Sequence, residues 1–300
     1  MNTHNNYTQR NQIDITSAAL LVDWSISTWT GRRTDKKATA ELLHQNGARK
    51  GVASVNKSIM GNFDELSALT SAKTRFDSAL KGATMPWTDN GLRLLPVAQH
   101  QEFEHMITGL QQEWEDLLNK FRSAYAFKIG QAQLELGKLF DPDIYPPVDH
   151  VISKFKFTYH YMPLANASDF RVQIGHEQAA QIRDQYAAMY DTQLQAAMGD
   201  VWQRVHTALT HLIDKLNACD ENEKTRLHNS TVETIHSMAR LLDACNLTND
   251  PQMTQAANAI RDMMLGVNKD ALKLSETLRG DTRKKAESIA KTINNLGLGW

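Results

Sequence analysis

The chain has 300 residues, of which 41% are hydrophobic and 22% are charged, and its formal net charge is −1. A chain of this length and composition can bury a sizeable core, and its near-neutral charge argues against a broadly basic nucleic-acid-binding protein and against an acidic mimic of DNA. No apolar run approaches the roughly 20 residues that cross a bilayer, so we expect a cytoplasmic protein without membrane contact.

The first expected elements are a polar leader, a strand and a short helix. Residues 1–12 are rich in Asn, Gln and Thr, which indicates a disordered leader rather than a signal peptide. Between residues 13 and 29, β-branched and aromatic residues alternate with polar ones around Trp24, which predicts a strand. Thr34 or Asp35 then caps a helix that continues to Gln45.

Two longer helices are expected next. Residues 63–80 place apolar side chains on roughly one side of a helix. Residues 85–96 contain Pro, Asp-Asn and Gly, which indicates a turn with a short extended piece. The following helix carries an apolar seam and is expected to continue to Leu139, with a bend near Gly130. Its seam consists of Phe103, Ile107, Leu110, Trp114, Leu117, Phe121 and Ala124.

The strongest strand signal lies between residues 155 and 162. Aromatic residues alternate there with polar ones, at positions 155, 157, 159 and 161, as expected for a strand with one buried face. Residues 170–174 are a candidate partner strand, and the strand near Trp24 can join both in a small antiparallel sheet. We therefore expect a mixed α+β domain over residues 13–175.

Residues 176–300 are expected to be helical. Apolar periodicity and short intervening turns predict an antiparallel, coiled-coil-like arm of three helices over 177–217, 224–245 and 251–296. The third helix is expected to kink near Gly266 or Gly280. The predicted fold class is thus mainly α with a small antiparallel β-sheet (α+β) and a long C-terminal helical arm.

The third helix of the arm carries apolar residues spaced four and three apart, which form one narrow seam. Such a seam serves packing within a chain and self-association alike, so we expect a homo-oligomer. The terminal Trp300 is either part of a frayed tail or a docking hook. The residues assigned to a partner or oligomer seam are Met253, Ile260, Met264, Val267, Leu274, Leu278 and Trp300.

No catalytic centre emerges from the titratable residues. His100 precedes Glu104 by one helical turn, but a metal site needs three or four converging ligands, so a structural or solvated role is favoured. Acidic residues beside prolines at 141, 143 and 149 are typical of turns, with cation binding as the weaker alternative. No phosphate-binding glycine motif and no nucleophile elbow is present. We expect no metal, no cofactor and no enzyme activity, and a metal-dependent enzyme is the least favoured function.

The two cysteines are expected near the ends of successive helices. Antiparallel helices of different length need not bring Cys219 and Cys245 together. With no disulfide framework and no export signal, reduced thiols are favoured over a bridge between them.

Two clusters of cations stand out. The first contains Arg32, Arg33, Lys36 and Lys37, with Arg49 and Lys50 nearby, and the second contains Arg279, Arg283, Lys284 and Lys285. Aromatic residues precede the first cluster, a mixture that can hold a phosphate backbone. Acidic neighbours accompany both, at Asp35 and at Asp281 and Glu287, so a solvated surface is favoured over a nucleic-acid site.

Several motifs of the first half occur in the order seen in a known family. They are Leu20–Lys37, Val55–Ser58, Met85–Pro96, Leu139–Pro146 and Asp169–Val172. Over residues 18–175 the chain thereby resembles a family of uncharacterised bacteriophage and prophage proteins, whose members often lie beside a MoxR/CobS-like AAA+ ATPase. The resemblance implies a phage protein of the host cytoplasm with this ATPase as a partner, and it transfers no catalytic residues.

These features predict a non-enzymatic binding or assembly protein that oligomerises and docks on a protein partner. A MoxR-type AAA+ ATPase is the candidate partner. The alternative is a nucleic-acid-associated protein that uses Arg32, Arg33, Lys36 and Lys37.

Overall fold

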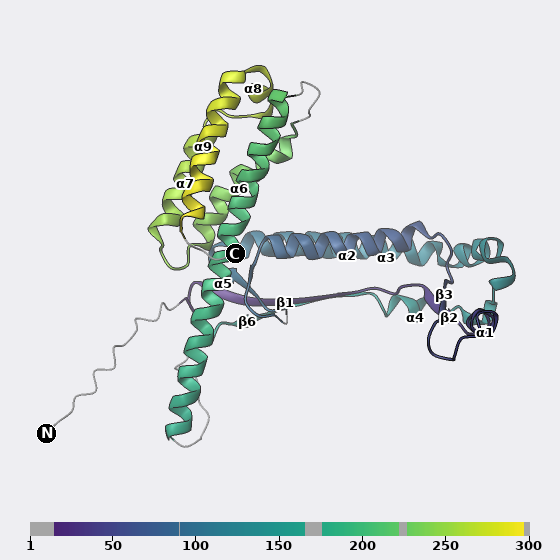
Figure 1. The fold of residues 1–300 in the computed structure, drawn as a ribbon. Coiled ribbons are helices and arrows are strands. Elements are labelled where there is room, and N and C mark those ends of the chain that lie inside the picture. The colour runs from purple at the N-terminus through teal and green to yellow at the C-terminus, as the bar shows by residue number, and fades with distance from the viewer. Residues whose placement is uncertain (1–14, 90, 166–175, 222–226, 297–300) are drawn as a thin grey trace. The chain divides into compact units, whose positions relative to one another are not determined.

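The computed structural model describes residues 15–89, 91–165, 176–221 and 227–296 (Figure 1). It confirms a mainly α chain with a small antiparallel sheet. The chain divides into two compact units, each assembled from separate segments of the sequence. Unit 1 comprises Met1–Asp23, Ala83–Gln101 and Tyr161–Trp300, and unit 2 comprises Trp24–Gly82 and Glu102–His160.

Four strands form the larger sheet, in the order β4-β5-β1-β6. They are β1 (Ala19–Ser27), β4 (Met85–Pro86), β5 (Arg93–Pro96) and β6 (Lys156–Pro163). β1 and β5 are antiparallel, with Leu20 opposite Leu95. Exposed and half-buried residues alternate along β6 from 156 to 161, which confirms the strand predicted from its aromatic alternation. The candidate strand at 170–174 lies outside the described residues.

Unit 2 is built on α2 (Asp64–Gly82) and α3 (His100–Leu136), which lie side by side (Figure 1). The predicted seam of α3 faces the core, because Phe103, Ile107, Trp114 and Phe121 are buried there. The rings of Phe76 in α2 and Trp114 in α3 meet with centroids 6.2 Å apart, and Phe63, directly before α2, stacks on Phe121 at 4.9 Å. Aromatic packing of this kind dominates the stability of such a core.

One end of unit 2 carries α1 (Lys36–Gln45) and a two-stranded antiparallel ribbon of β2 (Arg32–Asp35) and β3 (Val55–Ser58) (Figure 1). Of the two predicted caps, Thr34 and Asp35, it is Asp35 that caps α1, since its carboxylate accepts a hydrogen bond from Ala38 N at 2.9 Å. The shorter helices of the chain are η1 (Val97–Gln99), η2 (Gly137–Leu139), η3 (Pro142–Ile144) and α4 (Val148–Ile152).

Unit 1 is a helical bundle that packs on the β4–β5 hairpin. Its longest helix contacts two others, and together they enclose a core that includes Val205, Leu209 and Leu212. At 46 residues this longest helix extends about 69 Å. The bundle helices are α5 (His176–Glu221), α6 (Asn229–Cys245), α7 (Pro251–Met264), α8 (Lys269–Leu274) and α9 (Glu276–Asn294).

The prediction of a single third helix over 251–296 is wrong, because three helices occupy that range. The first interruption lies at Gly266, as expected, where the backbone has φ +73° and Asn268 caps the next helix. The second lies at Ser275, whose side chain accepts from Leu278 N and starts α9. Gly280, the other expected kink, lies inside α9.

The compact units do not follow the expected division at residue 175, because Ala83–Gln101 groups with the C-terminal helices. Whether residues 13–175 and 176–300 fold as separate domains stays a prediction. The expected leader, residues 1–12, lies outside the described residues. Within the described part of the chain, no helix has both the length and the hydropathy that a membrane crossing requires.

Candidate functional site

The titratable residues considered as ligands are dispersed. Across residues 15–89, 91–165, 176–221 and 227–296, no three His, Cys, Asp or Glu side chains converge as metal ligands would. The His100 ring lies 5.1 Å from the Tyr161 ring, centroid to centroid. The Asp141 carboxylate accepts from Asp143 N in a turn, and Asp149 lies 3.5 Å from Arg122. These acidic residues therefore take the turn and surface roles that the sequence favoured.

The two cysteines are not bonded to each other. Cys245 is buried in the bundle and Cys219 is half-buried. Burial raises the pKa of the Cys245 thiol to about 12, although the nearby Arg204 acts to lower it, and Asp200 adds a smaller raising effect. A thiol with so high a pKa is a poor nucleophile and a poor metal ligand at neutral pH.

Most of the predicted partner seam lies inside the bundle core. Met253, Ile260, Met264 and Val267 are at most 6% exposed, and Leu278 packs at the margin of the core. Leu274 is the exception at 88% exposed, because the break at Gly266 starts a new helix, α8, in which Leu272 is the buried residue. Trp300 lies outside the described residues. The seam is therefore used chiefly for packing within the chain.

The second cationic cluster is also engaged within unit 1. Arg279 Nε lies 2.6 Å from one carboxylate oxygen of Asp220, and Arg283 lies 2.8 Å from the other. These ion pairs join α9 to α5, and hydrogen bonding to Arg279 holds the pKa of Asp220 below its usual value. The sequence placed the counter-charge at Asp281 and Glu287, but the partner lies about 60 residues away. Lys284 and Lys285 remain exposed.

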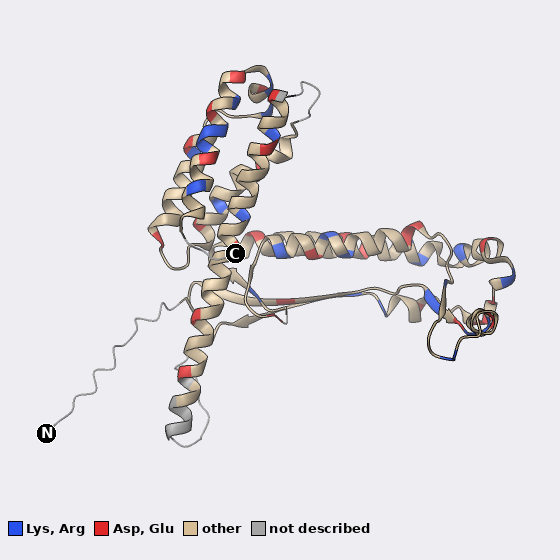
Figure 2. Cartoon of the chain, in the orientation of Figure 1, with Lys and Arg blue, Asp and Glu red and all other residues tan. Residues whose placement is uncertain are grey.

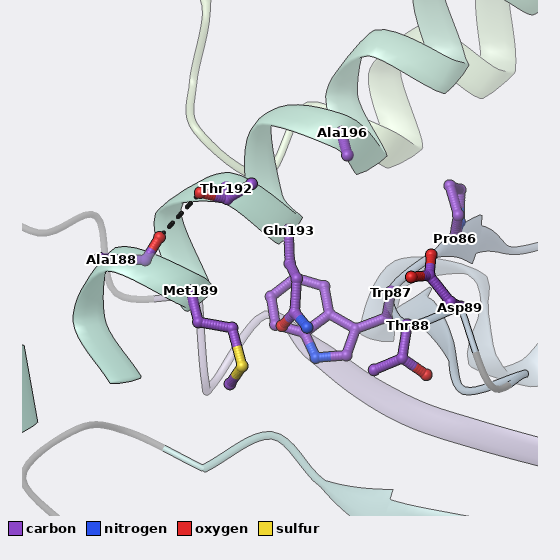
Figure 3. A pocket seen from close by; sticks show the side chains of 9 residues that line it. All are labelled: Pro86, Trp87, Thr88, Asp89, Ala188, Met189, Thr192, Gln193 and Ala196. Carbon is purple, nitrogen blue, oxygen red and sulfur yellow. Dashed lines mark hydrogen bonds between the residues drawn. The ribbon is translucent and has the colours of Figure 1, made fainter. Parts of the chain in front are cut away.

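An open hollow of about 620 Å³ lies between the β4–β5 hairpin and α5 in unit 1 (Figure 3). Trp87 and Gln193 both line it, and the Trp87 ring meets the Tyr190 ring edge-on, with centroids 5.4 Å apart. Arg204 donates to the Thr84 carbonyl at 2.8 Å and thereby ties the hairpin to α5. Asp89 is the one charged residue of the described lining, so the hollow offers no acid–base pair for a reaction.

The outer face of α3 in unit 2 exposes two large apolar side chains. Phe127 is 68% exposed and Leu134 is 85% exposed. They are seven residues apart, so they lie on the same side of the helix, and Gly130 lies between them. A side chain at Gly130 would meet no atom within 4 Å. We call Phe127, Gly130 and Leu134 the α3 outer face.

The α3 outer face adjoins a second open hollow of about 620 Å³. Phe127 forms one wall, and the other lining residues are Glu65, Asn119, Lys120, Ser123 and Ala124. An exposed aromatic ring at the edge of a shallow, open surface is available for contact with another protein. The Phe103–Ala124 seam does not include this face. The signal in the sequence is that Phe127 and Leu134, two large apolar residues, lie off that seam.

The first cationic cluster is exposed on the β2–β3 ribbon and α1. Arg32, Arg33, Lys36 and Lys37 are all exposed, as are Arg49 and Lys50 in the loop that follows α1. Figure 2 shows the basic residues along β2. Arg33 donates to the Ile144 carbonyl at 3.4 Å. Within the described residues, these six side chains form no ion pair. The neighbouring Asp35 instead pairs with Lys57 at 3.0 Å.

Comparison with known proteins gives no assignment: no family model, no curated protein and no solved structure matches this chain. The surfaces that the fold leaves exposed carry the remaining information on function. Two exposed surfaces that combine neighbouring groups of one kind are the α3 outer face and the cationic ribbon, both within unit 2.

Proposed function

We propose that the protein is a non-enzymatic binding and assembly protein that self-associates through the α3 outer face. The observation that carries the proposal is the exposure of Phe127 at 68% and Leu134 at 85% on one side of a long helix. Two large apolar side chains exposed two turns apart on one side of a helix are costly in water and favour an interaction surface there. The adjoining hollow is shallow and wide open, so it extends the contact area beside Phe127.

A second copy of this chain is the occupant that fits the face best. In an antiparallel pair of α3 helices crossing near Gly130, Phe127 of each copy packs against Leu134 of the other. Such an arrangement is two-fold symmetric and closes on itself as a dimer. The absence of a side chain at Gly130 lets the two helix backbones approach at the crossing point, as small residues do at other helix crossings.

The dimer would then present its remaining surfaces to a protein partner. The resemblance of residues 18–175 to phage proteins encoded beside a MoxR/CobS-like AAA+ ATPase supports that ATPase as the partner. A host-cell cytoplasmic location follows from the same resemblance. Exposed large residues outside the dimer contact, such as Leu265 at 84% exposed, are where we would look for the docking contact.

The self-association test compares two variants by light scattering over a concentration series. We expect the unaltered chain to exceed the monomer mass of 33.8 kDa, and F127S/L134S to approach it. Loss of two buried anchors should raise the dimer Kd at least about tenfold. L274S is the matched control, because Leu274 is equally exposed but lies in unit 1. Circular dichroism checks that all variants keep their helices.

Two outcomes would overturn this part of the proposal. One is a chain that stays monomeric at every concentration, and the other is a dimer that L274S weakens as much as F127S/L134S does. The partner claim needs its own test, which is co-purification with a neighbouring MoxR-type ATPase from cells that express both. If the ATPase elutes separately while the dimer persists, the partner claim fails and the dimer claim stands.

A further inference from the structure

The β2–β3 ribbon has two chemically different faces. The register pairs Asp35 with Val55 and Thr34 with Asn56, so side chains alternate between the faces. On the inner face, Asp35 and Lys57 form an ion pair 3.0 Å apart, with side chains 11% and 13% exposed. The outer face carries four exposed polar residues: Arg32, Thr34, Asn56 and Ser58.

The ion pair with Lys57 occupies Asp35, which is one of the few acidic residues near the cationic cluster. Between Arg32 and Lys57 the chain has seven Lys and Arg residues and two acidic ones, a net charge of +5 in a chain whose total is −1. Because Asp35 is engaged with Lys57 and with the first turn of α1, it does not neutralise the cations on the outer side. Glu41 is the remaining acidic residue of this segment.

The position of two of these lysines is unfavourable for α1 itself. Lys36 and Lys37 occupy the first turn of α1, which contains no acidic residue. The helix dipole disfavours cations at that end, at a cost of about 0.3–1 kcal/mol for each exposed charge. Because Lys36 and Lys37 destabilise α1, their presence there favours a role in binding an anion outside the chain. They add to the outer face of the ribbon, which supplies the hydrogen-bonding groups.

We propose that the outer face of the β2–β3 ribbon binds double-stranded DNA, with the ribbon in the major groove. That groove is about 12 Å wide and admits a two-stranded ribbon, whose strands are about 4.8 Å apart. Arg and Asn are the side chains that read guanine and adenine edges there, and Arg32 and Asn56 occupy this face. The lysines of α1 and the Arg49–Lys50 loop then contact phosphates on either side.

The outer face fits DNA better than it fits a lipid surface. Helices and ribbons that bind membranes insert large apolar side chains below the headgroups. Arg32, Thr34, Asn56 and Ser58 include none. The large apolar side chains exposed in this segment, Leu42 and Val52, lie outside the two strands. The Thr34 hydroxyl donates to the Asn56 side-chain oxygen at 2.8 Å, which leaves the Asn56 amide group as a donor toward solvent.

The test measures binding of the full chain to a fluorescent DNA duplex by anisotropy as salt is raised. With about four phosphate contacts, log Kd should change with log salt at a slope near 3.6, so affinity falls roughly a hundredfold between about 50 and 200 mM salt. K36A/K37A should reduce that slope by about 1.8. The matched control is K284A/K285A, which removes an equally exposed pair of lysines from α9 and should leave the slope unchanged.

Further arms separate DNA from other anions. Duplex RNA, whose major groove is too narrow for a ribbon, should bind more weakly than DNA. The DNA proposal is overturned by equal or tighter binding of duplex RNA, by binding to phosphatidylserine vesicles in preference to DNA, or by a DNA affinity that salt does not change. Equal slopes for K36A/K37A and K284A/K285A overturn the assignment to the ribbon. F127S/L134S should still bind DNA, so failure of dimerisation and failure of this proposal are distinguishable.

Discussion

The two units of this chain treat the same kinds of residue in opposite ways. In unit 1, the apolar seam of α7 is consumed by the bundle, where Met253 and Ile260 have no exposed surface. In unit 2, the long helix α3 buries one apolar seam and leaves Phe127 and Leu134 exposed on its other side. An apolar stripe in the sequence thus predicts burial, but it does not say whether the covering surface belongs to the same chain.

The cations repeat the contrast. Arg279 and Arg283 of unit 1 share the Asp220 carboxylate, whereas Arg32, Lys36 and Lys37 of unit 2 form no ion pair among the described residues. A charge that is satisfied inside a unit contributes to stability, and one that is not remains available for a partner. We therefore assign stability to the paired residues of unit 1 and binding to the exposed residues of unit 2.

The largest effect expected from a closed bundle concerns thiol reactivity. With a pKa of about 12, only about one Cys245 in 10⁴ is a thiolate near pH 8, and the side chain is 1% exposed. Cys245 should therefore react with an aromatic disulfide reagent at least about a thousandfold more slowly than the half-buried Cys219. The C245A variant identifies the fast thiol. Similar rates for both thiols in the folded protein would show that the bundle opens readily around α6.

A pair of leucines in α8 tests which residues complete the unit 1 core. Leu272 is fully buried and Leu274 is 88% exposed. L272A should lower the free energy of unfolding by about 2–5 kcal/mol, because it removes buried contacts and leaves a cavity. L274A should change it by less than about 0.5 kcal/mol. Urea denaturation measures both changes. A larger loss of unfolding free energy for L274A than for L272A would mean that Leu274 is the buried residue, as expected for one unbroken helix.

The leucine pair also marks how far sequence patterns go in this chain. The strands at 19–27 and 156–163 and the helices beginning at Lys36 and Asp64 follow from local alternation, capping and periodicity. Of the two expected kinks, at Gly266 or Gly280, the structure has the break at Gly266, where glycine tolerates the positive φ. The break at Ser275 was missed, although serine is a favoured N-cap, because a continuous apolar spacing masked it.

What the sequence did not give were the long-range pairings and the exposed faces. The pairing of Arg279 with Asp220 depends on how α9 packs on α5, which no local rule specifies. The grouping of Ala83–Gln101 with the C-terminal helices is likewise a tertiary fact. The cationic cluster was found from composition, but its separation from Asp35 required the register of β2 and β3. Phe127 and Leu134 lie off the buried seam of α3, so apolar periodicity alone does not indicate the α3 outer face.

A smaller effect tests how firmly unit 2 holds the segment after α3. The Tyr125 hydroxyl donates to the Pro146 carbonyl at 2.8 Å. Y125F should therefore lower the free energy of unfolding by about 1 kcal/mol at neutral pH. If Y125F leaves the free energy of unfolding unchanged, the segment around Pro146 moves independently of α3.

The same tyrosine gives a pH dependence of known sign. Burial raises the pKa of Tyr125 to about 12, with a further contribution from Tyr145. The neutral form is the one that folding favours, so its contribution is complete below pH 10 and is lost as pH rises toward 12. Unfolding measured from neutral to alkaline pH should show the difference between the unaltered chain and Y125F shrinking above pH 10. A constant difference would contradict the burial of this hydroxyl.

The smallest effect separates the two groups of cations. D220N removes the carboxylate shared by Arg279 and Arg283, and it should lower the free energy of unfolding by about 1 kcal/mol at neutral pH. Hydrogen bonding to Arg279 lowers the pKa of Asp220 from 3.8, so this contribution is present above pH 3.8 and is lost as pH falls below it. The unaltered chain and D220N should therefore converge in acid.

K36A/K37A is the counterpart in unit 2. Because these lysines have no ion pair among the described residues and oppose the dipole of α1, their removal should leave stability unchanged or raise it slightly. Thermal unfolding of D220N and K36A/K37A, measured in parallel, shows whether the lysines of α1 contribute to stability as Asp220 does. If K36A/K37A destabilises the protein as much as D220N does, the lysines of α1 serve the fold, and the distinction between satisfied and available charges is lost.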